Sequence, residues 1–206
     1  MRVHIFVSLF AVFILGGCSS GISKTDCLQM DWEQVGFVDG ERGLDIGQLG
    51  AHQDTCSEHE VSADADAYYR GHEQGVREFC QPENGFEMGK QGYRYTGICP
   101  EDLENDFYAE YDIGLKFQTI YYEINQIERT LNNNSATITK LHSGINLANL
   151  RLDTEDLTFQ QQTQLRQSIE SMTDQVLDYE LDSQRLEPAL TQKLRELEAL
   201  NKAYGR

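Results

Sequence analysis

The sequence predicts a mainly α protein, in which a small disulfide-stapled helical module is followed by a long antiparallel coiled-coil hairpin. Three observations predict this fold class. Four cysteines and most glycines lie between residues 21 and 99. Beyond residue 116, apolar residues recur at steps of three and four, which is the pattern of a coiled-coil seam. A short acidic stretch near residue 155 divides that pattern into two arms.

The N-terminus reads as a secretory signal. An apolar segment from Ile5 to Leu15 is followed by Gly16-Gly17-Cys18. A membrane-spanning helix needs about 20 apolar residues, and this segment has fewer, so residues 1–17 are predicted to be a removed signal peptide. Cleavage there would free Cys18 to carry acyl chains such as palmitate, and several buried chains anchor a protein firmly on a bilayer.

Residues 18–25 would then form a lipidated tether. The residue after the lipidated cysteine is Ser19, whereas retention in the inner membrane of Gram-negative bacteria commonly uses Asp there. By resemblance to such lipoproteins, we expect the protein to be an outer-membrane lipoprotein of the cell envelope that faces the periplasm.

The chain is acidic. It has 34 Asp and Glu against 17 Lys and Arg, for a formal net charge of −17. Such an excess repels nucleic acid and anionic headgroups, so neither is an expected partner. It favours a solvated surface, and leaves cations or basic proteins as possible partners.

Residues 26–116 form the predicted module, and its four cysteines are expected to make disulfides. In an exported protein, Cys27, Cys56, Cys80 and Cys99 suggest two bridges. Sequence allows three pairings, and we favour bonds between chain neighbours because each would staple one helix-loop unit. A metal site is the alternative, but no Cys-x-x-Cys pair is present, so we expect no metal and no cofactor.

Glycines at steps of three or four follow aromatic residues within the module, which places a smooth groove beside a large ring on a helix face. Small residues there let two helix backbones approach closely. Turns and helix C-caps are the alternative role, favoured for Gly43, Gly47, Gly50 and Asn84-Gly85. The motif residues are Trp32, Gly36, Asp39, Gly40, Tyr68, Gly71, Gly75, Gly89, Gly92 and Tyr95.

These positions carry a resemblance to a family of bacterial lipoproteins known only as a domain of unknown function, over roughly residues 25–117. It implies a lipid-anchored module with a coiled-coil-like tail and brings no catalytic residue with it. The residues that carry it are Cys27, Asp31, Trp32, Gly36, Asp39, Gly40, His52, Cys56, Tyr68, Gly71, Gly75, Cys80, Gly89, Gly92, Tyr95, Cys99, Pro100, Phe107, Tyr111 and Gly114.

Catalytic residues are not identifiable from spacing. His52, His59 and His72 stand among carboxylates that could serve as general acids or bases, but no metalloprotease or serine-nucleophile motif is present. A periplasmic hydrolase is therefore the least favoured function, after a small-ligand or cation-binding module on an acidic face around Tyr68, Tyr69 and Tyr95.

Residues 117–206 form the predicted hairpin, and a helix is expected to begin after Pro100. Asn134 is the polar residue of the first seam and would fix register or partner choice. The helix is predicted to continue through Asn132–Ser135. The first seam comprises Ile120, Ile124, Ile127, Leu131, Asn134, Ile138, Leu141, Ile145, Ala148 and Leu152.

The turn is placed at Asp153–Asp156, with acidic residues before a new helix. Pro188 is expected to kink or restart that helix. The second seam comprises Leu165, Ile169, Met172, Val176, Tyr179, Ser183, Leu186 and Leu190, and then slips to Leu194, Leu197 and Tyr204.

The expected function is a structural or protein-interaction component of the envelope. The hairpin could close on itself or pair with another chain, and the first arrangement is favoured. A partner would be another envelope protein or a second copy.

Overall fold

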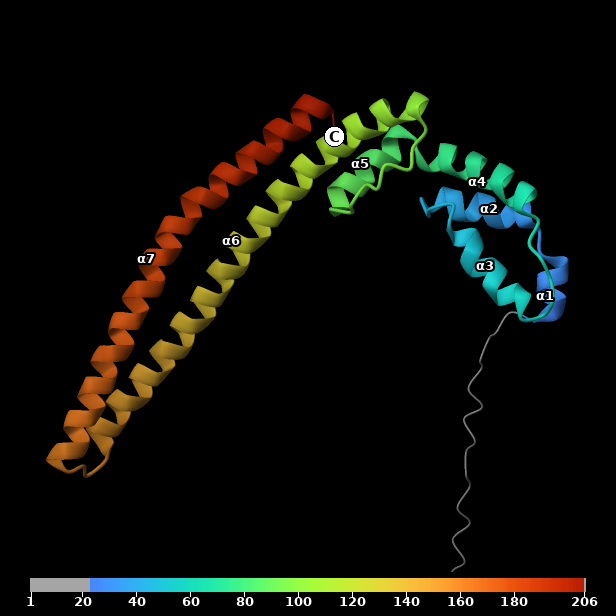
Figure 1. Cartoon of the computed structure of the whole chain (residues 1–206). Helices are drawn as coiled ribbons and strands as arrows, with labels where there is room; N and C mark the ends of the chain where they lie inside the picture. The colour runs from blue at the N-terminus through green and yellow to red at the C-terminus, as the bar shows by residue number, and fades with distance from the viewer. Residues whose placement is uncertain (1–22, 206) are drawn as a thin grey trace, which may run out of the picture. The chain divides into compact units, whose positions relative to one another are not determined.

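The computed structural model describes residues 23–205, and every regular element in that range is a helix (Figure 1). The predicted signal peptide, Cys18 and the first part of the tether lie outside the described residues. None of the described helices is both long enough and apolar enough to cross a membrane. The helices are α1 (Lys24–Gln29), α2 (Trp32–Glu41), α3 (Gln48–Ser57), α4 (Ala65–Phe79), α5 (Pro82–Gln91), α6 (Glu101–Thr154) and α7 (Phe159–Tyr204).

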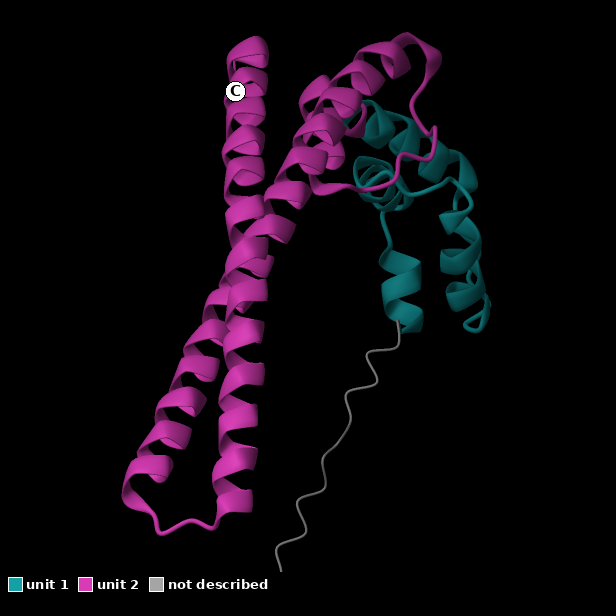
Figure 2. Cartoon of the chain, turned by 90° about the vertical axis from the view of Figure 1, so that its left-hand side faces the viewer, with its two compact units in different colours: residues 1–78 teal, residues 79–206 magenta. Residues whose placement is uncertain are grey.

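The chain divides into two compact units, residues 1–78 and 79–206 (Figure 2). The division falls in the last turn of α4, within the stretch predicted as one module. The boundary predicted after residue 116 lies inside the continuous helix α6.

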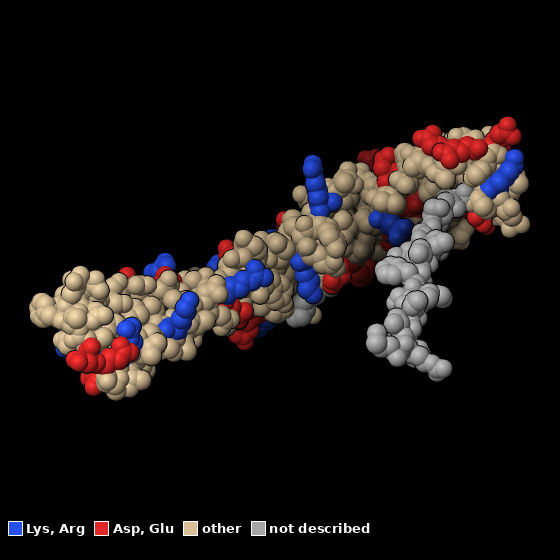
Figure 3. Space-filling model, turned by 90° about the horizontal axis from the view of Figure 1, so that it is seen from below, with Lys and Arg blue, Asp and Glu red and all other residues tan. Residues whose placement is uncertain are grey.

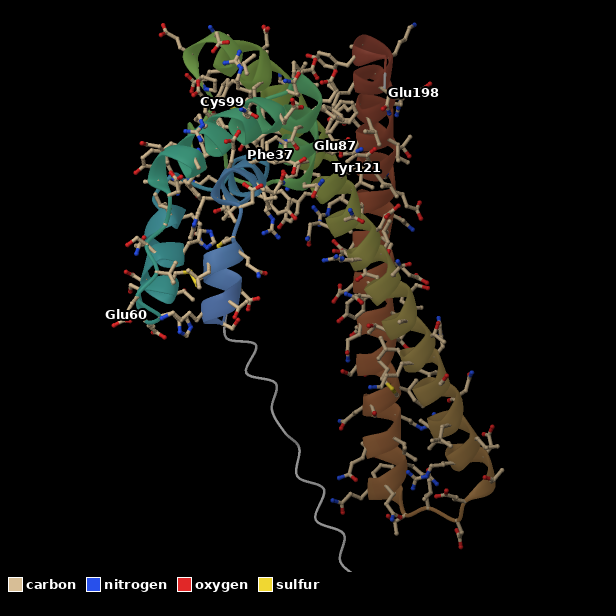
Figure 4. All side chains as sticks on the ribbon, turned by 90° about the vertical axis from the view of Figure 1, so that its right-hand side faces the viewer. Phe37, Glu60, Glu87, Cys99, Tyr121 and Glu198 are labelled. Carbon is tan, nitrogen blue, oxygen red and sulfur yellow. A yellow bond between two sulfur atoms is a disulfide. The ribbon has the colours of Figure 1, made fainter. Side chains whose placement is uncertain are left out.

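Unit 1 is built on a crossing of α2 and α4 at four glycines. A β-carbon on Gly36 would overlap the carbonyl oxygen of Tyr68, and one on Gly71 would overlap the backbone of α2. Gly75 lies against the carbonyl of Phe37, a residue labelled in Figure 4. A glycine costs about 1 kcal/mol relative to alanine in a helix interior, so this packing offsets an intrinsic weakness of both helices.

The core of unit 1 surrounds a disulfide between Cys27 and Cys56. Trp32 and Tyr68 are buried beside it. Helix α1 starts at a capping box formed by Ser23 and Asp26, which satisfies the first backbone donors. Because Cys27 lies in α1 and Cys56 in α3, the disulfide links α1 to the last turn of α3.

Unit 2 repeats the glycine crossing between α5 and the start of α6. Gly85 and Gly89 lie against the carbonyls of Phe107 and Tyr111, and Gly114 lies against the carbonyl of Phe86. A second disulfide joins Cys80, before α5, to Cys99, before α6. Both bonds connect chain neighbours, as favoured from the sequence.

Three glycine assignments differ from the sequence predictions. Gly50 is not in a turn or a C-cap but lies within α3. Gly85 is not in a turn but inside α5, where its lack of a side chain admits Phe107. Gly92 is not part of a helix face but caps the C-terminus of α5 with a φ of 73°, a left-handed conformation that glycine adopts without steric cost. Gly43 has a φ of 70° at the turn after α2, as expected for a turn residue.

Helices α6 and α7 of unit 2 lie side by side as an antiparallel hairpin that closes on itself (Figure 1). Helix α6 continues through Asn132–Ser135, as predicted. The turn comes slightly later than predicted, because Thr158 and Gln161 form the capping box that starts α7. Buried Asn134 donates from Nδ2 to Asp182 Oδ2 at 3.0 Å and to Ser183 Oγ at 3.2 Å on the facing helix.

The predicted slip of the second seam to Leu194 is wrong. Leu194 is 47% exposed, whereas Lys193 is half-buried and places Nζ 2.8 Å from Glu123 Oε2 on α6. The heptad phase thus runs through Leu190, Lys193 and Leu197 without a break. Pro188 lies within α7, which neither ends nor restarts there.

Candidate functional site

The two glycine crossings are copies of one sequence pattern. The first copy reads Cys27-x8-Gly36 and then Cys56-x11-Tyr68-x2-Gly71. The second reads Cys80-x8-Gly89 and then Cys99-x11-Tyr111-x2-Gly114.

The contacts match as well as the spacing. The backbone nitrogen four residues after each tyrosine, at His72 or Leu115, would stand 2.9 Å from a β-carbon on Gly36 or Gly89. Each unit therefore contains one stapled crossing of the same design. Residues that differ between the copies are candidates for a role beyond packing.

The largest such difference is a buried carboxylate in unit 1. Asp39 on α2 is 5% exposed and accepts two hydrogen bonds at Oδ2. Tyr68 Oη donates at 2.9 Å, and His52 Nε2 lies at 2.7 Å. Since a carboxylate only accepts, Nε2 of His52 carries the hydrogen in this contact.

The position of His52 is fixed by two anchors on α3. The disulfide at Cys56 holds the end of that helix. The Gln53 side chain accepts from the backbone N–H of Ala63 at 2.7 Å and donates to the Val61 carbonyl at 3.5 Å. These contacts bind α3 to the following loop, so the imidazole is held against Asp39 by both covalent and polar links.

A second histidine braces the turn after α2. His72 Nε2 donates to the carbonyl of Leu44 at 2.8 Å, and the His72 ring stacks on the Tyr68 ring at 5.8 Å between centroids. The backbone N–H of Leu44 donates to the carbonyl of Asp39. His72 thus has a structural role in holding the segment that surrounds the carboxylate.

Tyr68 is fully buried, and this changes its acidity. Burial raises the pKa of the Tyr68 hydroxyl well above its ordinary value, and the hydrogen bond to Asp39 and its negative charge raise it further. Tyr68 is therefore a hydrogen-bond donor throughout the physiological range. A tyrosine that is 0% exposed also cannot line the surface face proposed from the sequence.

An open cavity of about 380 Å³ adjoins the Asp39–His52 pair within unit 1. Its apolar wall comes from Val35 and Val38, and Arg42 stands at the same face of α2. The lining residues are Asp31, Gln34, Val35, Val38, Asp39, Arg42 and His52.

Sequence reasoning missed Val35, Val38 and Arg42. A usable signal was present, because these three and Asp39 recur at helical spacing on one face. The pairing of Asp39 with His52 had no such signal, since the two residues lie on different helices.

The other predicted acid–base residues do not join this site. Within residues 23–205, no group of three or more His, Cys, Asp or Glu side chains is arranged to hold a metal ion. Glu60, labelled in Figure 4, lies in the turn beyond α3 and is largely exposed. The four predicted cysteines are all taken up in the two disulfides.

The motif residue Tyr95 belongs to an aromatic cluster in unit 2. Its ring lies 4.9 Å from that of Phe107 between centroids. Its hydroxyl donates to Glu104 and accepts from the backbone N–H of Cys99. Burial raises the pKa of Tyr95. The cluster is linked to the second disulfide through the Cys99 backbone and serves packing.

The distribution of charged side chains on the surface is consistent with the acidic composition. On the face shown in Figure 3, Lys and Arg side chains stand singly along the molecule and form no continuous basic patch. Ion pairs such as Lys116–Asp112 and Arg151–Glu155 link neighbouring turns of single helices. Exposed pairs of this kind contribute little to stability.

No curated protein and no solved structure shows a significant match to the chain. One protein family does match, as the motif positions indicated. Residues 31–116, which contain both glycine crossings, match the family described as "Protein of unknown function (DUF2799)".

Proposed function

We propose that this chain is a lipid-anchored structural or protein-interaction component of the bacterial cell envelope, located on the periplasmic side of the outer membrane. The N-terminal pattern ending at Cys18 supports the anchor. Two disulfides support an oxidising compartment, because such bonds are rare where thiols are kept reduced.

The hairpin is the observation that carries the interaction role. Helix α7 alone has 46 residues, which at 1.5 Å per residue is about 70 Å. Because α6 and α7 bury their seams against each other, a partner would contact the outer faces of the hairpin. Leu177 and Leu181 lie one turn apart on α7 and are 52% and 63% exposed.

The anchor is tested by Cys18→Ser. We expect the parent chain to incorporate an alkyne-tagged palmitate analogue and to sediment with outer membranes, and the variant to do neither. A label that persists in the variant, or a parent chain that is never labelled, would contradict the anchor.

The interaction role is tested by photo-crosslinking in cells. A photoreactive residue at position 181 is expected to yield a discrete protein adduct, whereas one at the seam position of Ile145 is not. The double change Leu177→Asp and Leu181→Asp, combined with a photoreactive residue at Gln184, should abolish the adduct without lowering the melting temperature. A lack of adducts at positions 177, 181 and 184 would overturn the proposal that this face binds a protein.

A further inference from the structure

The second copy of the crossing shows that the fold does not need a carboxylate at the Asp39 position. In that copy, Gly92 stands at the equivalent position. The Tyr111 hydroxyl donates instead to the backbone carbonyl of Tyr93 at 2.8 Å. A buried carboxylate is costly unless it is paired, and unit 2 closes the same crossing without one.

The histidine is also specific to the first copy. The cysteines of the first disulfide are 29 residues apart and those of the second 19. The longer connection contains α3 and brings His52 to Asp39. The pair is thus an addition to a crossing that unit 2 forms without it, and it stands at the edge of a cavity.

We propose that this cavity is a binding site for a small organic anion with an apolar body, such as a carboxylic acid. The site lies entirely in unit 1 and does not depend on the proposed role of the hairpin. Its volume of about 380 Å³ is at the lower end of the range of small-molecule pockets.

Arg42 supplies the positive charge on the open side of the cavity. The guanidinium of Arg42 has no ion-pair partner among residues 23–205, and a guanidinium matches the geometry of a carboxylate. Asp39 directs both of its side-chain hydrogen bonds through Oδ2 to internal donors. Asp31 accepts from the backbone N–H of Gln34 as the cap of α2.

His52 presents its second nitrogen to the solvent side. Nε2 is held on Asp39, and Nδ1 has no hydrogen-bond partner among the described residues. No buried side-chain polar atom of that part of the chain lacks a partner, so Nδ1 is accessible to solvent. Val35 and Val38 provide the apolar contact for the rest of the ligand.

The test is a titration of the full chain with hexanoate and benzoate, followed by NMR shifts of the Val35 and Val38 methyl groups and the His52 ring. We expect saturable shifts at these residues and none at Gly92 or Tyr93. Hexylamine and hexanol, which match hexanoate in length, should bind at least about tenfold more weakly, as should acetate, which lacks the apolar chain.

Two arginine variants test whether Arg42 contacts the bound carboxylate. Arg42 is exposed, so Arg42→Ala should fold normally and weaken hexanoate binding about tenfold or more. The matched control Arg70→Ala removes an exposed arginine of the same unit that pairs with Glu33, and should leave affinity within about twofold. Absence of saturable shifts, equal binding of hexylamine, or equal affinity in the two arginine variants would each overturn the proposal.

Discussion

Gly89 on α5 lies against the carbonyl group of Tyr111 on α6 so closely that a β-carbon on the glycine would overlap the oxygen. Gly36 has the same relation to Tyr68 in the other unit. In both places the obstacle is backbone, which cannot rotate away as a flexible side chain can. The crossing distance is therefore set by the absence of one carbon atom on each side.

Gly89→Ala is expected to destabilise unit 2 by about 2–3 kcal/mol or more, because overpacking forces the two helices apart. Gly50→Ala is the matched control, since Gly50 lies within α3 with open space around its β-carbon position. That change should stabilise by up to about 1 kcal/mol through helix propensity. Denaturant unfolding measures both, and equal effects of the two changes would contradict the close crossing.

The buried hydroxyl of Tyr68 predicts a loss of stability at high pH. Its pKa in the folded protein is raised above the value near 10 of the unfolded chain. The contribution is fully present below pH 10 and is lost as the pH rises toward the folded pKa. Above pH 10, this group alone lowers the free energy of unfolding by up to about 1.4 kcal/mol per pH unit.

Tyr68→Phe should therefore flatten the alkaline decline, and at neutral pH cost about 1–3 kcal/mol through the lost hydrogen bond to Asp39. Tyr69→Phe is the control, because Tyr69 is 46% exposed. Thermal unfolding between pH 7 and 11 gives both slopes. A Tyr68→Phe slope identical to that of Tyr69→Phe would exclude Tyr68 as the source.

Asn134 is predicted to determine which turns of α6 and α7 face each other. In Asn134→Leu, Asp182 keeps its contact with Arg185, and the Ser183 hydroxyl keeps its bond to the Tyr179 carbonyl. No buried polar group is left unpaired, so we expect unchanged or higher thermal stability. We also expect more than one helix register or a change of oligomeric state.

Distances between spin labels on α6 and α7 report the register, and light scattering reports the oligomeric state. Asn133→Leu changes the exposed neighbour and should give the distance distribution of the parent chain. One unchanged distribution in both variants would show that Asn134 has no role in register.

The parts of the fold that follow from a local sequence pattern were predictable. The heptad phase predicted both long helices, and four cysteines in a chain with a predicted secretory signal predicted two disulfides. The contact of Gly36 with Tyr68 was readable only in part, because spacing shows a smooth helix face without naming the helix that packs on it. The duplication was obscured since its copies differ by the insertion that contains α3.

The candidate site was less predictable for a physical reason. Asp39 and His52 meet because a disulfide and the Gln53 contacts place α3 beside α2, and such tertiary placement has no sequence period. Spacing rules detect ligands that share one helix or one loop. They do not detect a pair that is brought together by the fold.

The phase of the seam near the end of α7 gives the last prediction. If hydrophobicity alone assigns the seam, it slips to Leu194 and the heptad is interrupted. In the structure Lys193 occupies the seam position instead, with its ammonium group between Glu123 and Glu196. Leu194→Ala should then change the free energy of unfolding by no more than about 0.5 kcal/mol, as at other surface positions.

Leu190→Ala and Leu197→Ala remove half-buried seam residues and should cost clearly more, toward the range of about 2–5 kcal/mol for a core leucine. Lys193→Leu should leave the melting temperature nearly unchanged, because ion pairs to carboxylates as exposed as Glu123 and Glu196 contribute little to stability. Denaturant and thermal unfolding of the four variants decide between the two seam assignments. If Leu194→Ala lowers the free energy of unfolding as much as Leu190→Ala, the seam slips to Leu194 as the sequence predicted. The small loss that we expect at Leu194 agrees only with a seam that continues through Lys193.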